Sequence, residues 1–138
     1  LVDYIRNQKD FVSMLNEKGD ILYSFTLYNV YPHKIFMALD DEGNMAINLP
    51  DSYLIVNKKG KPIVKKQKSK REDIYQIAYS SGSFFAVSVE NQVLFFSNTG
   101  NVLGKRNITM PARMRPSGDR DTAFLETKEE IISFRLFQ

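Results

Sequence analysis

One short phrase occurs three times in this chain at almost equal intervals. Each copy is an apolar run, a four-residue polar turn that ends in glycine, and a second apolar run, as in VLFFSNTGNVLGKR at residues 93–106. The turn glycines are Gly19, Gly60 and Gly100, which lie 41 and 40 residues apart. Glycine accepts the positive φ that a tight turn between antiparallel strands needs. The phrase therefore predicts three β-hairpins in a structural repeat of about 40 residues.

A further hairpin is predicted upstream of each of the two later copies. KIFMALDDEGNMAINL (34–49) contains Gly43, and IYQIAYSSGSFFAVSV (74–89) contains Gly82, so these glycines precede Gly60 and Gly100 by 17 and 18 residues. The unit therefore has four short strands and is complete twice, while residues 122–137 match the second and third strands of another unit. We expect the units to lie at approximately 1–27, 33–67, 73–108 and 112–138.

Four antiparallel strands in about 40 residues are typical of one blade of a β-propeller. The 138 residues correspond to about three and a half blades, whereas propellers close with roughly four to eight. We therefore expect a single all-β repeat domain over 1–138 that forms a partial propeller. The alternative folds are a β-sandwich and a β-meander, in which the equal spacing of the hairpins is a coincidence.

An open stack of blades would expose apolar sheet faces. Three arrangements would cover them: more chain beyond both ends, a second chain through self-association, or C-terminal strands that complete the N-terminal blade in a small ring. The chain starts with Leu1 and not with Met. We therefore expect it to be a fragment of a longer protein.

Individual residues make the strand prediction more specific. Pro62 cannot donate a hydrogen bond to a neighbouring strand, so its strand is expected at a sheet edge. Four consecutive apolar residues at 93–96 predict a strand that is buried on both faces. Residues 2–15 also have rough helical spacing, but the match of 11–15 with the later strands favours a strand there.

The hairpin phrase resembles the repeat of quinoprotein-type propellers, which occurs in pyrroloquinoline-quinone dehydrogenases and in an outer-membrane assembly lipoprotein. That pattern is an apolar strand, Asp or Asn, two residues, Gly, two apolar residues and Trp. Residues 16–19 and 57–60 match it with Asn and Gly, residues 97–100 begin with Ser, and the Trp is replaced by Tyr23, Val64 and Gly104. The resemblance covers approximately residues 11–137 and implies a propeller in the cell envelope. No residues match those that surround the quinone, so no cofactor is expected.

Catalytic and metal-binding motifs are not found in the sequence. The chain has no cysteine, which excludes disulfides and thiolate chemistry. His33 is the single histidine and is expected in a solvated loop between Pro32 and Lys34. The acidic run at 40–44 is expected to be a hairpin turn, because the apolar residues at 45–47 end it too early for a calcium loop.

The most unusual segment runs from Lys58 to Arg71, with eight basic residues in fourteen and no acidic residue before Glu72. The net charge of the chain is +3, so the remaining residues carry −5. One interpretation is an exposed outer strand whose lysines protect a sheet edge from aggregation. The other is a contact with an anionic partner, with salt-sensitive binding. The expected contact residues are Lys58, Lys59, Lys65, Lys66, Lys68, Lys70 and Arg71.

A second basic stretch follows the third hairpin and contains Lys105, Arg106, Arg113, Arg115 and Arg120. It is expected in the linker between the third and fourth units. In a ring of blades this linker and residues 66–73 would have equivalent positions. Arg113 and Arg115 are therefore expected to join the first segment in one basic patch.

These observations favour a non-catalytic protein-binding or scaffold module. A binder of an anionic ligand, nucleic acid or membrane surface through residues 58–71 is the first alternative. A fragment of a propeller enzyme is the second, for which Lys34 and Asp73 are the only polar residues found near the starts of innermost strands. Fold alone does not decide among these functions.

Overall fold

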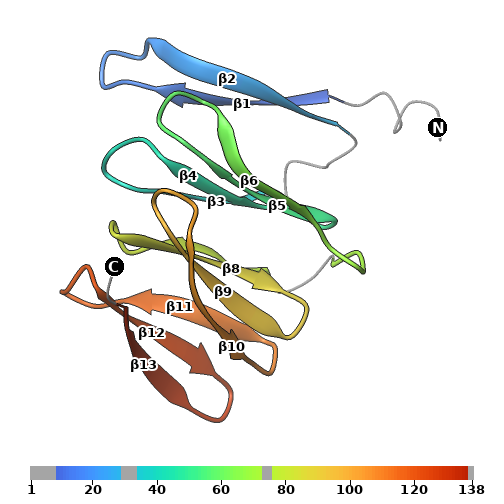
Figure 1. Cartoon of the computed structure of the whole chain (residues 1–138), viewed down its shortest axis with the longest axis vertical. Helices are drawn as coiled ribbons and strands as arrows, with labels where there is room; N and C mark the ends of the chain where they lie inside the picture. The colour runs from blue at the N-terminus through green and yellow to red at the C-terminus, as the bar shows by residue number, and fades with distance from the viewer. Residues whose placement is uncertain (1–8, 29–33, 73–75, 137–138) are drawn as a thin grey trace.

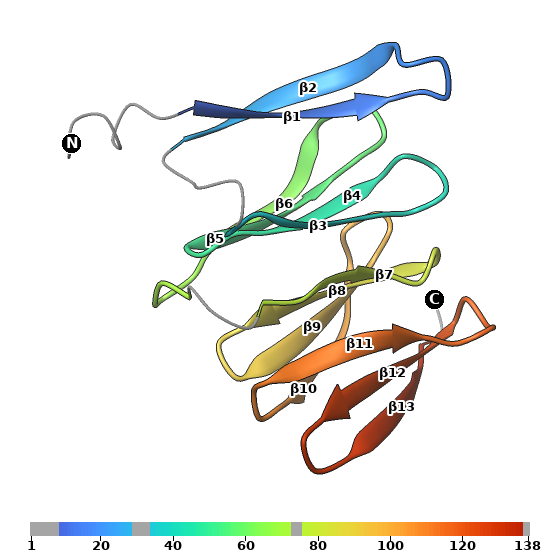
Figure 2. The same ribbon diagram turned by 180° about the vertical axis from the view of Figure 1, so that it is seen from behind.

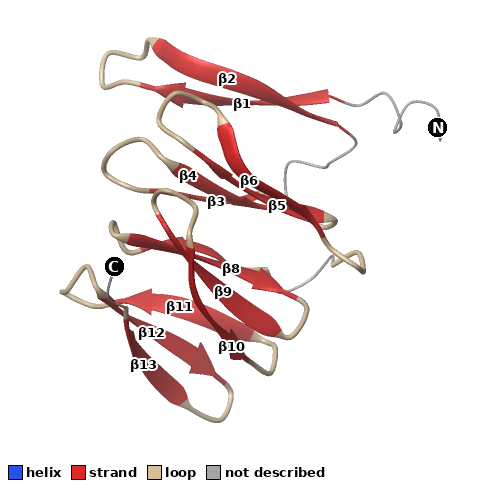
Figure 3. Ribbon diagram, in the orientation of Figure 1, coloured by secondary structure: helices blue, strands red, loops and turns tan. Residues whose placement is uncertain are grey.

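The computed structural model describes residues 9–28, 34–72 and 76–136, with the side chains of residues 9, 10 and 28 excepted. These residues form thirteen strands and no α-helix (Figure 3). The described part of the chain thus contains no helix that could cross a membrane. The strands are β1 (Lys9–Leu15), β2 (Ile21–Tyr28), β3 (Phe36–Leu39), β4 (Met45–Asn48), β5 (Ser52–Val56), β6 (Pro62–Gln67), β7 (Ala78–Ser80), β8 (Phe84–Val89), β9 (Gln92–Ser97), β10 (Val102–Asn107), β11 (Ala112–Pro116), β12 (Thr122–Thr127) and β13 (Ile131–Arg135).

The strands form four antiparallel sheets, and each sheet contains strands that follow one another in the sequence. Sheet A is β1–β2, sheet B is β3–β4–β5–β6, sheet C is β7–β8–β9–β10 and sheet D is β11–β12–β13. The sheets are stacked face to face in chain order (Figure 1). A sandwich would have two facing sheets, whereas the described residues form a series of four. The fold is therefore all-β and is that of a partial propeller, as the 40-residue repeat predicted.

The sheets place the predicted strands as the sequence indicated. Pro62 begins β6, which is an edge strand of sheet B. Strand β9 lies between β8 and β10, and Val93, Phe95 and Phe96 on it are buried. Residues 9–15 form strand β1 and not a helix.

The hairpin turns are held by side chains at their first position. The Asn57 Oδ1 accepts hydrogen bonds from the backbone N–H groups of Lys59 and Lys61, each at 3.0 Å. The Asp40 Oδ1 does the same in the β3–β4 turn, where it accepts from Glu42 at 2.9 Å and Asn44 at 2.8 Å. A short polar side chain there satisfies backbone donors that the turn leaves unpaired. The acidic run at 40–44 is thus a hairpin turn.

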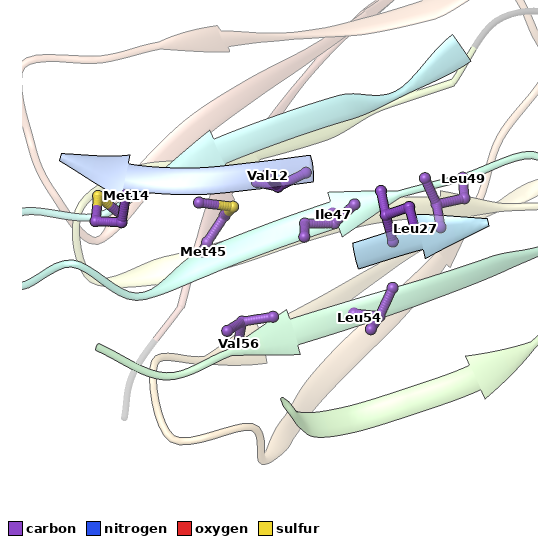
Figure 4. Close-up of a cluster of buried hydrophobic side chains, with 8 residues drawn as sticks. All are labelled: Val12, Met14, Leu27, Met45, Ile47, Leu49, Leu54 and Val56. Atoms are coloured by element: carbon purple, nitrogen blue, oxygen red, sulfur yellow. The ribbon is translucent and has the colours of Figure 1, made fainter. Parts of the chain in front are cut away.

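Three apolar layers fill the spaces between successive sheets. The layer between sheets A and B is shown in Figure 4 and contains Val12, Met14, Leu27, Met45, Ile47, Leu49, Leu54 and Val56. The layer between sheets B and C contains Ala46, Tyr53, Ile55, Phe85, Val87 and Phe96. The layer between sheets C and D contains Ile77, Phe84, Ala86, Val93, Phe95, Ile108, Ala123 and Leu125. Sheets B and C therefore bury both faces, which explains their continuous apolar runs.

A side chain from one sheet also rests on a turn glycine of the next. A Cβ at Gly60 would lie 2.8 Å from the Cβ of Tyr23, and a Cβ at Gly100 would lie 3.0 Å from the Cγ2 of Val64. Tyr23 and Val64 stand where the quinoprotein repeat has Trp. The tyrosine hydroxyl donates to the Gly43 carbonyl oxygen at 3.2 Å. Burial, and secondarily the charge of Asp40, raises the pKa of Tyr23.

A buried polar contact joins sheets B and C. The Asn48 Nδ2 donates to the carbonyl oxygens of Ile77 at 2.8 Å and Ser88 at 2.9 Å. The Ser88 hydroxyl oxygen accepts from the Ile77 N–H at 2.8 Å. Asn48 is fully buried. Its amide therefore satisfies two carbonyl groups that water does not reach.

Candidate functional site

The turns of the stack lie on two opposite sides. The β1–β2, β3–β4, β5–β6, β7–β8, β9–β10 and β11–β12 turns lie on the left in Figure 1, and we call this side the hairpin rim. The β4–β5, β8–β9 and β12–β13 turns lie on the opposite side. The predicted site residues are therefore distributed over the hairpin rim, the opposite rim and the strands between them.

Arg120 connects three turns of the hairpin rim. Its guanidinium donates to the Gly82 carbonyl oxygen at 2.5 Å and forms an ion pair with Asp41 at 3.1 Å. Its own carbonyl oxygen accepts a hydrogen bond from the Ser83 hydroxyl at 2.7 Å. Arg120 and Asp41 are both exposed, so this ion pair adds little to stability. Arg120 was expected in a linker, but it lies in the β11–β12 turn, where it joins sheets B, C and D.

An open pocket of about 380 Å³ lies on the hairpin rim. It lies between the β3–β4 and β5–β6 turns of sheet B and the β9–β10 turn of sheet C. It is lined by seven polar or charged residues and one apolar residue, which are Glu42, Asn44, Asn57, Lys58, Lys59, Ile63, Asn98 and Thr99. This is where the structure places Lys58 and Lys59 of the predicted basic segment.

The other basic residues of this segment follow the outer edge of sheet B. Lys65 and Lys66 are exposed on β6, which has no further strand beyond it among the described residues. Lys70 and Arg71 are exposed in the loop that follows β6. The segment therefore forms a charged ridge that extends from one rim to the other, with Lys58 and Lys59 at its start.

Lys68 departs from this arrangement. Its side chain is fully covered, and its Nζ lies 2.7 Å from the Glu72 Oε2. Its backbone N–H donates to the Asp51 carbonyl oxygen at 2.8 Å. Burial lowers the pKa of Lys68, although the contacts with Glu72 and Asp51 oppose that shift. The prediction that Lys68 is a surface contact residue was wrong, because its ammonium is used within the fold.

Neutralising the exposed lysines should leave the fold stable. In the variant Lys65→Gln/Lys66→Gln/Lys70→Gln we expect the free energy of unfolding to change by less than about 0.5 kcal/mol, because exposed charges contribute little. Lys68→Gln alone should lower it by about 1–3 kcal/mol, because the partly buried Glu72 carboxylate loses its ammonium partner and keeps only the Glu90 N–H. Urea denaturation followed by circular dichroism measures both. Equal losses in the two variants would contradict the burial of Lys68.

The second basic stretch does not form the predicted linker. Lys105 and Arg106 lie on β10, an edge strand of sheet C, and Arg113 and Arg115 lie on β11, the first strand of sheet D. The Glu126 carboxylate accepts from Arg113 at 3.1 Å and from Arg115 at 2.9 Å.

These hydrogen bonds, from Arg115 first, hold the pKa of Glu126 below its usual value. Arg113 and Arg115 lie on β11, the first strand of sheet D, whereas the charged ridge lies on β6, the fourth strand of sheet B. The first strands of sheets B, C and D lie along the edge of the stack that faces the viewer in Figure 2. The expected merger of Arg113 and Arg115 with the β6 ridge was therefore wrong.

Several other predictions concern possible chemistry. His33 and Asp73 lie outside the described residues, and Lys34 lies just before β3. Within residues 9–28, 34–72 and 76–136, no three His, Cys, Asp or Glu side chains are grouped to hold a metal ion. The predicted turn glycines Gly19, Gly43, Gly60, Gly82 and Gly100 have φ between 83° and 97°.

The structure also shows exposed apolar side chains near the first sheet that sequence reasoning did not identify one by one. On sheet A they are Phe11, Leu15, Ile21 and Leu22, and on β3 they are Phe36, Met37 and Leu39. Val12 and Met14 face sheet B, so the alternation of a strand places Phe11 and Leu15 on the outer face of sheet A. The alternation FVSML was visible in the sequence, but both of its faces are apolar and only the structure shows which one is covered.

No family model matches this sequence, and no curated protein matches it. Solved structures give three distant similarities. A protein of unknown function from Bacteroides caccae is 16% identical with a TM-score of 0.41, covering 91% of this chain and 53% of that one. The WD40 domain of SCAP from fission yeast is 10% identical with a TM-score of 0.45, covering 76% of this chain and 34% of that one. BamB from Moraxella catarrhalis is 10% identical with a TM-score of 0.44, covering 87% of this chain and 35% of that one. The chain spans about half or less of the length of each.

Proposed function

We propose that this chain is a non-catalytic protein-binding or scaffold module whose partner covers the open side of sheet A. The observation that carries the proposal is the group of exposed apolar side chains on this sheet, of which Phe11 has 71% of its surface accessible. Large apolar residues gathered on an exposed sheet face are typical of protein interaction sites. Sheets B and C, by contrast, cover both of their faces with neighbouring sheets.

The chemistry of this face favours a protein over a charged polymer. Phe11 and Leu15 alternate with Ser13, whose hydroxyl lies 2.7 Å from that of Ser24 on β2. The outer face of sheet A thus combines apolar side chains with small hydroxyl groups. Burying such a surface against an apolar partner is favourable by about 25 cal/mol per Å².

The test compares proteins captured from a lysate of the source cells by variants of the chain. We expect Phe11→Ser/Leu22→Ser to lose a partner that the wild type retains at 500 mM salt. The matched control is Val102→Ser/Ile131→Ser, which changes two exposed apolar residues on other sheets and should retain that partner. Identical capture by the wild type and Phe11→Ser/Leu22→Ser would contradict the proposal.

The same experiment addresses the anionic-partner hypothesis, which the exposed lysines of β6 favour. Loss of the captured partner in Lys65→Gln/Lys66→Gln/Lys70→Gln, together with its release at 500 mM salt, would identify the charged ridge as the binding surface. Retention by this variant would assign binding to the apolar side of sheet A.

A further inference from the structure

The fourth strands of sheets B and C carry equivalent pairs of basic residues. Lys65 and Lys66 on β6 lie 40 residues before Lys105 and Arg106 on β10, which is also the interval between the turn glycines of the two hairpins. All four side chains are exposed. Both strands are edges of their sheets and lie on the side of the stack that faces the viewer in Figure 1. The two basic pairs therefore have the same place in successive units.

Strand pairing shows that one residue of each pair is turned toward the other sheet. Residues directly opposite each other on paired strands have their side chains on the same face of the sheet. Lys66 is opposite Tyr53, and Lys105 is opposite Leu94. Tyr53 belongs to the apolar layer between sheets B and C, and Leu94 packs against that layer. Lys66 and Lys105 therefore face each other at the outer end of the layer between sheets B and C.

The other two basic residues flank this position. Lys65 is opposite Leu54, which faces sheet A, and Arg106 is opposite Val93, which faces sheet D. Positive charge therefore continues along the outer edge of the stack on both sides of the gap between β6 and β10.

No acidic residue of the two surrounding segments offsets this charge, since residues 58–71 and 91–118 contain neither Asp nor Glu. The ion pairs found within residues 9–28, 34–72 and 76–136 involve other cations. Glu72 follows β6 and Glu90 lies in the β8–β9 turn, but their carboxylates contact Lys68 and the Ser69 hydroxyl. Two ammonium groups that face each other repel, so an anion placed between them is attracted by both.

The backbone of both strands is also available at this place. The Lys68 N–H donates to the Asp51 oxygen, and the Ile108 N–H donates to the Asn91 oxygen, each at 2.8 Å. Bonding toward the paired strand alternates along an antiparallel ladder. With the observed register, the peptide groups of Lys65 and Lys105 therefore point outward from β6 and β10.

We propose that Lys66 and Lys105 bind carboxylates of an acidic segment of a partner protein, which lies extended along the outer edges of sheets B and C. Lys65 and Arg106 contact further carboxylates of the same segment. This surface is separate from the apolar side of sheet A, so the inference goes beyond the proposed function.

The edge strands favour a peptide over a nucleic acid. Neither β6 (PIVKKQ) nor β10 (VLGKRN) contains an aromatic residue on which a base could stack. The outward peptide groups offer both an N–H donor and a carbonyl acceptor, and a second peptide satisfies both, whereas a phosphate group satisfies only the donor. Ile63 and Val102, near the starts of the same strands, are 37% and 67% exposed and give the segment apolar contacts.

The test measures binding of a labelled peptide of about ten residues in which Glu and Thr alternate, because alternate side chains of an extended peptide lie on one face. Fluorescence anisotropy gives the dissociation constant. Lys66→Gln/Lys105→Gln should raise it about tenfold or more, because the carboxylates lose both ammonium groups. Lys18→Gln/Lys128→Gln removes the same charge from two exposed turns elsewhere and should change it less than about twofold. The peptide with Gln in place of Glu should not bind.

Charge reversal tests the same contact with the opposite sign. Lys66→Glu/Lys105→Glu should lose the Glu–Thr peptide and bind a Lys–Thr peptide of equal length. These lysines are exposed and contribute little to stability, so the variants remain folded, which circular dichroism verifies.

Equal dissociation constants for Lys66→Gln/Lys105→Gln and Lys18→Gln/Lys128→Gln would overturn the proposal, because binding would then follow net charge alone. Failure of the wild type to bind the Glu–Thr peptide would also overturn it and leave the lysines as protection of the sheet edges. Tighter binding of oligothymidylate or of phosphatidylserine vesicles, lost in Lys66→Gln/Lys105→Gln, would assign the surface to a nucleic acid or a membrane instead. Capture by Phe11→Ser/Leu22→Ser is independent of these results, so either surface can be rejected without the other.

Discussion

Replacing Asn48 with aspartate should lower the free energy of unfolding by about 3 kcal/mol or more. The Asn48 amide donates to the Ile77 and Ser88 carbonyl oxygens between sheets B and C. A carboxylate at this fully buried place would bring negative charge to two carbonyl oxygens and remove the donor that Asn48 supplies to both, although the Ile77 oxygen would still accept from the Ser88 N–H at 3.1 Å. The loss is large because an unpaired buried polar group retains its full desolvation cost.

The pH dependence gives this prediction a second observable. A buried carboxyl beside two carbonyl oxygens has its pKa raised above that of the unfolded chain, because its protonated form can donate a hydrogen bond. The folded state then binds more protons than the unfolded state, so the destabilisation by Asn48→Asp should become smaller as the pH falls from 7 to 5.

Urea denaturation at several pH values measures both effects. Asn101→Asp is the matched control, since Asn101 is exposed in the β9–β10 turn and should change stability by less than about 0.5 kcal/mol. Wild-type stability of Asn48→Asp at pH 7 would show that the contact between sheets B and C does not depend on this amide.

Asn48 also illustrates which parts of the fold the sequence could predict. Hairpins were predictable because their determinants are local: a turn glycine such as Gly60 and a polar residue such as Asn57 lie within a few residues of each other. The edge position of β6 followed from Pro62 alone. The role of Asn48 depends on Ile77 and on a strand 40 residues further along the chain, so no local pattern indicates it.

In the candidate site, too, the sequence predicts the features with local determinants and misses those that depend on strand pairing. Lys65 and Lys66 are exposed because they lie on an edge strand, which the sequence indicated. Arg113 and Arg115 bind Glu126 because the β11–β12 register places Arg113 opposite Glu126, and register is a property of the folded sheet. The spacing of four residues between Lys68 and Glu72 was the one local signal of their ion pair.

The second large effect is expected at Gly60. Its φ is +83°, and a Cβ there would lie 2.8 Å from the Tyr23 Cβ of sheet A. Gly19 has a similar φ of +87°, but a Cβ there would meet no atom within 4 Å. Alanine at Gly19 should therefore cost only the backbone strain, about 1 kcal/mol, whereas alanine at Gly60 should cost about 2–4 kcal/mol because Tyr23 must also move.

Thermal and urea denaturation of Gly19→Ala and Gly60→Ala separate the cost of backbone strain from the cost of displacing Tyr23, since both variants share the turn geometry. A larger loss at Gly60 would show that glycine is required there by the approach of sheet A. Gly100 offers an independent check, because Val64 of sheet B approaches it as Tyr23 approaches Gly60. Equal losses at Gly19 and Gly60 would mean that Tyr23 moves aside freely. The repeated glycine would then serve only its own hairpin, and the close approach of Tyr23 to Gly60 would not help to hold sheet A on sheet B.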